Sequence, residues 1–151
     1  MASDTRNYFR VGEPYAVTDF RYLATCPVGV GNLLAEELRQ LGASSVRETP
    51  AGVECEGALS TAYRACLWSR LANRFLVRVA ESDVDSTDAL YQAVKAVSWP
   101  THFTSKTGFA VEFRGQSSYI KNTHFGALKV KDGIVDRFRD DGLLRPSVTK
   151  S

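Results

Sequence analysis

The stretch Phe20-Arg-Tyr-Leu-Ala-Thr-Cys26, followed by Pro27, is typical of a short β-strand that stops at a proline. A helix is predicted directly after it over residues 30–41, because apolar residues recur there at three- and four-residue spacing. These residues form one stripe: Val30, Leu33, Leu34, Leu38 and Leu41. Gly42 is well suited to end this helix, since glycine readily takes the left-handed conformation found there.

Further strands and a second helix are predicted after this helix. Two short strands are predicted at 44–48 and 52–56, around a turn formed by Thr49–Gly52, and a further strand at 75–80. Between them Ser60 can cap a second helix to Leu71, which places four residues on one face: Tyr63, Cys66, Leu67 and Arg70. The order strand–helix–strand–strand–helix–strand predicts an α+β, ferredoxin-like βαββαβ domain over residues 20–83. This fold hosts many functions and decides none of them.

A second unit is predicted over residues 84–151, with a polar extension over 1–19 preceding both units. Ser86 or Thr87 can cap a helix to Ala96, residues 109–113 form a strand, and Asn122 or Thr123 can cap a long helix to about Arg139. One strand cannot form a stable sheet. We therefore expect it to pair with the first unit, or its partner strands to lie beyond residue 151, so that this second unit is incomplete at its C-terminal end.

The charge distribution separates the two parts of the chain. The net charge of the 151 residues is +2, but residues 1–105 carry ten Lys/Arg against twelve Asp/Glu, and residues 106–151 carry nine against five. Basic character in the last third favours a polyanionic partner there, although a solvated helix face is the alternative. Three cysteines without a Cys-x-x-Cys pattern, no signal peptide and no apolar run of membrane-spanning length favour a cytoplasmic protein without a metal site.

The sequence shows few of the features that are typical of a catalytic site. The turn Thr25-Cys-Pro-Val-Gly29-Val-Gly31 follows a strand and opens a helix, as a nucleotide-binding loop does, but Leu34 stands where the third glycine belongs. Neither a phosphate-binding loop nor an activated nucleophile nor a pair of poised carboxylates is evident. We therefore predict no catalytic residue, no metal ligand and no cofactor site in this chain, and a stand-alone enzyme is the least favoured class.

The start of the long helix is the strongest candidate for binding. Lys121-Asn-Thr-His124 brings a cation and hydrogen-bonding groups to a place where backbone N–H groups are free, which suits a phosphate. Plain capping by Asn122 or Thr123 is the alternative. Lys131 lies within the apolar arc of the helix, either as a snorkelling stem or as a cation at a groove edge. The candidate residues for contact with a nucleic acid, RNA or DNA, are Arg114, Lys121, Asn122, Thr123, Lys129, Lys131, Arg137 and Arg145.

These residues lie within a wider pattern that resembles a known family. The similar runs cover about residues 20–148: Leu23–Pro27 with Gly29, Leu33–Leu38, Leu41–Ala43, Gly52-Val53, Glu56-Gly57, Tyr63–Ala72, Asp88–Tyr91, Trp99, Phe109–Val111, Phe113, Lys121–Asp136 and Arg145–Val148. Together they resemble the N-terminal part of the bifunctional bacterial large-subunit ribosomal RNA guanine methyltransferases, which contains a THUMP region. The last residues, 149–151, depart from the pattern, which in the family continues into a strand hairpin.

The resemblance implies that RNA binding and methyl transfer are carried out by different domains. A ferredoxin-like unit would be followed by a THUMP unit that binds structured RNA, and separate domains with S-adenosylmethionine would methylate the exocyclic amine of a guanine. The motifs of those domains are absent from this sequence, so the chain is expected to be a truncated, non-catalytic part. The predicted function is an RNA-binding module that positions large-subunit ribosomal RNA for the methyltransferase domains. The alternative is a structural or protein-interaction domain without RNA affinity of its own.

Overall fold

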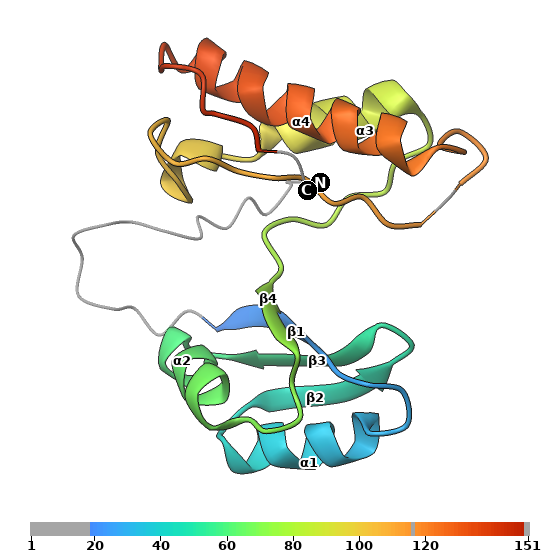
Figure 1. The fold of residues 1–151 in the computed structure, drawn as a ribbon, viewed down its shortest axis with the longest axis vertical. Coiled ribbons are helices and arrows are strands. Elements are labelled where there is room, and N and C mark those ends of the chain that lie inside the picture. Colours follow the sequence, from blue (N-terminus) through green and yellow to red (C-terminus); the bar gives the residue numbers. More distant parts are fainter. Residues whose placement is uncertain (1–18, 116, 150–151) are drawn as a thin grey trace, which may run out of the picture. The chain divides into compact units, whose positions relative to one another are not determined.

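The first unit contains a four-stranded sheet and two helices. The computed structural model describes residues 19–115 and 117–149, and the chain divides between Val79 and Ala80 into two compact units, each described here by itself. The elements of the first unit (Figure 1) are β1 (Phe20–Thr25), α1 (Gly31–Gln40), β2 (Ser44–Thr49), β3 (Gly52–Gly57), α2 (Leu59–Trp68) and β4 (Arg74–Val77). Their order confirms the predicted βαββαβ arrangement.

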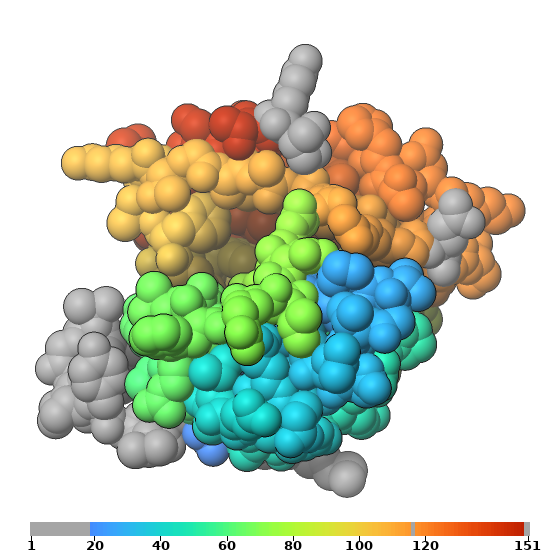
Figure 2. All heavy atoms as spheres, turned by 60° about the horizontal axis from the view of Figure 1, so that its bottom comes forward, coloured from blue at the N-terminus to red at the C-terminus, as the bar shows by residue number. Residues whose placement is uncertain are grey.

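The sheet has the strand order β2-β3-β1-β4, and every neighbouring pair is antiparallel. The first strand of the sequence, β1, is therefore central, and Tyr22 lies between Cys55 of β3 and Val77 of β4. Helix α1 forms part of the surface of this unit, where Figure 2 shows it in cyan. The sheet confirms the predicted α+β, ferredoxin-like fold.

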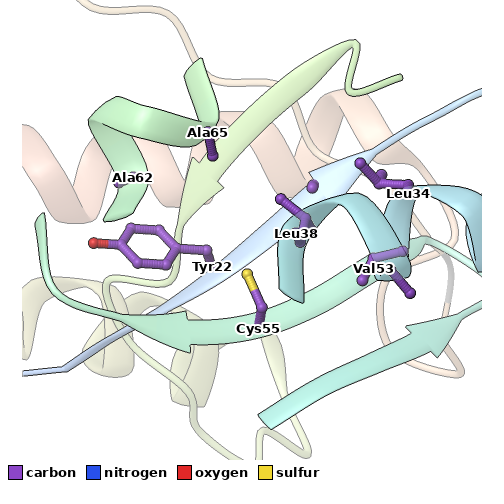
Figure 3. Packing of buried hydrophobic residues seen from close by; sticks show 9 residues of the cluster. Tyr22, Leu34, Leu38, Val53, Cys55, Ala62 and Ala65 are labelled. Carbon is purple, nitrogen blue, oxygen red and sulfur yellow. The ribbon is translucent and has the colours of Figure 1, made fainter. Parts of the chain in front are cut away.

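The core of this unit forms where alternate strand residues meet both helices. Tyr22 and Ala24 of β1 and Val53 and Cys55 of β3 point to one face of the sheet, as the two-residue period of a strand requires. Figure 3 shows the helix residues that cover them: Leu34 and Leu38 of α1 and Ala62 and Ala65 of α2. Burial in this core raises the pKa of Tyr22 to about 12 and that of Cys55 to about 11.

Helix α1 follows its predicted limits closely. Gly42 takes the left-handed conformation with φ 93°, and the Ala43 N–H donates to the Leu38 carbonyl, so the predicted stop is confirmed. The predicted apolar stripe is only partly right. Leu34 and Leu38 are fully buried, whereas Leu33 is exposed because it lies on the far side of the helix from the sheet.

Helix α2 corrects the sequence prediction more strongly. Its inward face is made by the small residues Ala62 and Ala65, whereas Tyr63 and Leu67, which the apolar spacing placed together on one face, are exposed. The predicted cap at Ser60 is also wrong, because the helix begins at Leu59 with Ala58 as its extended N-cap residue and no capping side chain. Apolar residues at three- and four-residue spacing form a stripe along a helix. Where two such stripes lie on neighbouring faces, the spacing does not show which of them packs on the sheet.

The second unit consists of α3 (Thr87–Ala96), the short 3₁₀ helix η1 (Trp99–Thr101) and α4 (Thr123–Asp140). Of the alternative caps, Ser86 caps α3 by accepting from the Ala89 N–H at 3.1 Å, and Asn122 caps α4 by accepting from the His124 N–H at 2.9 Å. Both caps were among the predicted ones.

Helices α3 and α4 run parallel and close together. Asp88 faces Lys129, Tyr91 faces Asp136 and Lys95 faces Asp140, so later residues of one helix meet later residues of the other. Gly133 permits this approach, because a Cβ there would lie 3.0 Å from the Val94 side chain.

The strand predicted at 109–113 is not formed. Instead, Phe109 makes an isolated parallel bridge with Val148, and its N–H donates to the Ser147 carbonyl at 3.0 Å. A strand needs a neighbouring ladder, and among the described residues only Phe109 of this segment finds one. The segment packs against α4 through its side chains instead. Phe103 joins Phe109 to Phe138, with ring centroids 5.4 and 5.1 Å apart.

Candidate nucleic-acid interface

The start of α4 is held in place by the turn that precedes it. The Ser117 hydroxyl accepts from the Ile120 N–H at 3.0 Å, and the Ser117 N–H donates to the Ile120 carbonyl at 3.0 Å. The Ile120 side chain is buried, and the Tyr119 hydroxyl donates to the Val84 carbonyl. These contacts fix the direction in which the first turn of α4 points.

The start of α4 carries exposed polar side chains, and its first turn has no acidic residue to neutralise them. They include Lys121, Thr123 and His124. Within the described part of the chain no ion pair involves Lys121. Asn122 satisfies one of the free N–H groups of the helix and leaves others open. The dipole of α4 adds a partial positive charge here, so the end of the helix favours an anion.

Arg114 lies beside the same end of α4. The ring of the preceding residue, Phe113, packs over Gly126, where an added Cβ would lie 2.7 Å from the ring. Arg114 itself is exposed and donates twice to the Glu112 carboxylate, at 2.9 Å from Nε and 2.7 Å from a terminal nitrogen. The structure therefore brings Arg114 to the N-terminal part of α4, with part of its charge already neutralised.

The three predicted cations within α4, out of the four that the helix contains, do not share one face. Successive helical residues are rotated by about 100°, which separates Lys129 from Lys131 by about 160° and Lys131 from Arg137 by about 120°. Each is also near a carboxylate: Lys129 is 3.9 Å from Asp88, Lys131 is 2.8 Å from Asp132, and Arg137 is 2.9 Å from Asp141. Their charge is thus largely balanced within the unit.

Arg145 lies beyond the opposite end of α4. Gly142 with φ 70° ends the helix, the Leu143 N–H donates to the Phe138 carbonyl, and buried Pro146 anchors the chain just after Arg145. The 18-residue helix is about 27 Å long, so Arg145 and Lys121 mark two well-separated points. Arg145 is exposed and has no ion-pair partner among the residues that the structure describes.

Polar side chains also connect α3 to α4 and help to hold the two helices together. The Tyr91 hydroxyl donates to Asp136 at 2.8 Å, which raises the pKa of Tyr91, and the hydrogen bond to Asp140 raises the pKa of Lys95. Burial lowers the pKa of His102. In the described ranges no cluster of three metal-ligating side chains occurs, and no helix is long and apolar enough to span a membrane.

Sequence reasoning missed a second group of exposed side chains on α2. Tyr63, Leu67 and Trp68 are exposed there beside Arg64 and Arg70. A signal was present in the sequence, because residues 57–80 contain four arginines and no aspartate or glutamate. The net charge of residues 1–105 is negative, and this average hid the local excess of positive charge on residues 57–80.

Comparison with protein families identifies both units. Residues 21–76 match the RlmL ferredoxin-like domain, and residues 84–151 match the THUMP domain. Curated relatives with the name ribosomal RNA large subunit methyltransferase K/L include proteins from Marinobacter nauticus, 53% identical over 127 residues, and Cellvibrio japonicus, 48% identical over 130 residues. These matches cover 84% and 86% of this chain, but only 18% and 17% of the relatives.

Solved structures show the same fold. SMU.472, assigned as a methyltransferase and crystallised with SAH, superposes with a TM-score of 0.73 at 22% identity, over 87% of this chain and 37% of that one. A predicted N6-adenine-specific DNA methylase from Listeria monocytogenes superposes with a TM-score of 0.70 at 24% identity, over 88% of this chain and 36% of that one. At this level of identity the likeness supports the fold alone.

Proposed function

Because this chain belongs to the ribosomal RNA large subunit methyltransferase K/L family, of which it carries the RlmL ferredoxin-like and THUMP domains, we propose that it binds large-subunit ribosomal RNA. In this proposal the THUMP unit holds structured RNA through phosphate contacts. The chain spans about 18% of the length of its curated relatives, so methyl transfer belongs to domains outside it. Its role is to position a guanine for methylation of the exocyclic amine by those domains, in the cytoplasm.

The observation that carries this proposal is the pair of exposed cations at the two ends of α4. Lys121 adjoins the free N–H groups and positive dipole end of the helix, and Arg145 follows its C-terminal end. Neither is committed to a carboxylate within the described residues, so both can meet phosphates without breaking an internal ion pair. Asn122 and Thr123 orient the helix start, and Arg114 lies beside it.

Lys129, Lys131 and Arg137 have a secondary part in the proposed interface. Each would have to exchange its carboxylate neighbour for a phosphate, which reduces the net gain from the contact. Their positions around α4 also prevent all three from touching one flat surface. An RNA groove that follows the helix from Lys121 to Arg145 can reach some of them.

The turn at residues 25–31 does not fit S-adenosylmethionine. The one turn that resembles a nucleotide-binding loop opens α1 at Gly31, and the Glu48 carboxylate lies directly against that glycine, where an added Cβ would collide with it. A carboxylate in this place repels an anionic group and fills the space beside the helix start. The cofactor therefore belongs to the methyltransferase domains of the longer relatives.

The test is binding of this chain to a large-subunit ribosomal RNA transcript across a salt series. The Lys121→Ala/Arg145→Ala variant is expected to weaken binding and to reduce the slope of log affinity against log salt by about two, since each phosphate contact contributes about one. The matched control, Lys131→Ala/Arg137→Ala, removes the same charge but from paired cations, so its slope is expected to change less.

Two outcomes would oppose the proposal. Affinity that does not vary with salt would exclude phosphate contacts as its source, and equal slopes for both double variants would exclude a special role for the ends of α4. If the folded chain binds no ribosomal RNA even at low salt, a structural or protein-docking role becomes the better account. Circular dichroism of each variant verifies that the helices are retained.

A further inference from the structure

The outer surface of α2 exposes large apolar and aromatic side chains. Tyr63, Leu67 and Trp68 are 61%, 79% and 70% exposed, which is unusual for residues of this size in a folded domain. Figure 2 shows side chains of α2, in green, on the surface of the first unit. The helix packs on the sheet through Ala62 and Ala65, so these larger residues contribute little to the core.

The side chains form one contiguous patch because of their spacing. Tyr63 and Leu67 are four residues apart, and so are Arg64 and Trp68, which makes each pair neighbours along the helix. The two pairs lie side by side. Arg70 follows just beyond the helix, with a side chain that is 91% exposed. We define these five residues as the α2 patch.

Charge distinguishes the α2 patch from an ordinary apolar surface. No aspartate or glutamate occurs between Glu56 and Glu81, a stretch that contains four arginines. The guanidinium of Arg64 donates to the Leu41 carbonyl at 3.4 Å, and that of Arg70 is 3.9 Å from Glu37. Two of the four cations on α4, in contrast, have carboxylates at 2.8–2.9 Å. The patch therefore combines two aromatic rings with positive charge that is weakly neutralised.

We propose that the α2 patch binds unpaired bases of single-stranded RNA, with Trp68 and Tyr63 stacking on bases and Arg64 and Arg70 meeting the adjoining phosphates. This inference rests on the proposed function, since it adds a second RNA contact in the ferredoxin-like unit. Every base offers a flat face to an aromatic ring, so such a contact is tolerant of sequence. The five patch residues include two arginines and no carboxylate, and this positive charge favours a polyanion as the partner.

The chain supplies its own probe for this contact. It has two tryptophans, and Trp99 belongs to the other unit, where its Nε1–H donates to the Val94 carbonyl at 2.7 Å. In a Trp99→Phe background Trp68 is the only tryptophan. Titration with a single-stranded RNA of about ten nucleotides is expected to quench its fluorescence, because a stacked base deactivates the excited indole. A closed RNA hairpin without unpaired bases beyond its loop is expected to quench much less.

Variants on the patch separate stacking from apolar docking. Trp68→Ala is expected to weaken binding of the single-stranded RNA by roughly tenfold, about 1.4 kcal/mol, whereas Trp68→Phe keeps a ring and retains most of the affinity. Leu67→Ala is the matched control, since it removes an equally exposed neighbour that has no aromatic face. Both positions are more than two-thirds exposed, so the three variants are expected to fold.

The outcomes distinguish this inference from the proposed function. If the ribosomal RNA transcript binds through Lys121 and Arg145 while Trp68→Ala changes nothing and Trp68 is not quenched, the inference fails and the proposed function stands. If the transcript does not bind at all, both fail. Equal losses from Leu67→Ala and Trp68→Ala would indicate apolar docking of a protein and would also overturn the inference.

Discussion

At the scale of single residues, the core of the first unit contains one unusual group. The Tyr22 hydroxyl is buried and has no hydrogen-bond partner among the described residues, although its ring packs 5.0 Å from that of Phe75. A buried hydroxyl that donates to nothing loses its hydration without compensation. Burial also raises the pKa of Tyr22 to about 12, so it stays neutral at every physiological pH.

Tyr22→Phe is therefore expected to leave the free energy of unfolding unchanged or to raise it by up to about 1 kcal/mol. Urea denaturation followed by circular dichroism measures this. The matched control is Tyr91→Phe, which removes a hydroxyl that donates to Asp136 at 2.8 Å and should cost about 1 kcal/mol. A clear loss of stability from Tyr22→Phe would mean that the hydroxyl has a partner in solution.

At the scale of elements, one carboxylate connects α1 to the loop after α2. Glu37 accepts from the Ser69 hydroxyl at 2.5 Å and from the Arg70 N–H at 3.0 Å. Burial alone would raise the pKa of Glu37, but these hydrogen bonds, a further one from the Leu71 N–H and the charge of Arg70 outweigh it, so the pKa is lowered. The loop that leads from α2 to β4 thus depends on an ionised Glu37.

The sign of the pH dependence follows from the lowered pKa. The folded state holds the Glu37 proton less tightly than the unfolded state, whose carboxyl has the ordinary value of 4.5. The stabilisation by Glu37 is therefore complete above that value and is lost as the pH falls through the lower folded pKa. Glu37→Gln is expected to cost about 1–2 kcal/mol at pH 7 and progressively less in acid, measured by urea denaturation at each pH.

Glu36→Gln is the matched control for this pH series. Glu36 is the neighbouring carboxylate, largely exposed and 3.5 Å from Arg39. A surface pair of this kind contributes little, so the variant is expected to lie within about 0.5 kcal/mol of the parent at every pH. A constant cost of Glu37→Gln from pH 7 into acid would contradict the assignment of the stabilisation to its charge.

At the scale of the whole molecule, the chain has two units with separate hydrophobic clusters. Leu34 and Leu38 belong to the core of the first unit, and Phe138, with Phe103, to that of the second. Leu34→Ala removes a fully buried side chain and is expected to destabilise the first unit by about 2–5 kcal/mol. The second unit, which has its own aromatic cluster, is expected to keep its stability.

Each unit offers its own reporter for this experiment. The Cys55 thiol is 3% exposed, so its labelling rate, read by mass spectrometry, follows opening of the first unit. Trp99, partly buried, follows the second unit by fluorescence in a Trp68→Phe background. Leu34→Ala should accelerate Cys55 labelling and leave the Trp99 transition in place. A shift of both reporters together would show that the two units unfold as one.

The sequence by itself determined the order of elements in the first unit and the stop at Gly42, and it narrowed each of two helix caps to a pair of neighbouring residues, because each feature depends on neighbouring residues along the chain. The family resemblance, carried by runs such as Lys121–Asp136, was also readable without coordinates. Only the tertiary structure decided that Ala62 and Ala65, and not Tyr63 and Leu67, face the sheet. It also decided the ion pairs between α3 and α4, since Lys129 meets Asp88 and Lys95 meets Asp140 only when the two helices pack together. Periodicity is a local property, whereas burial and the ion pairs between elements arise only when distant segments meet.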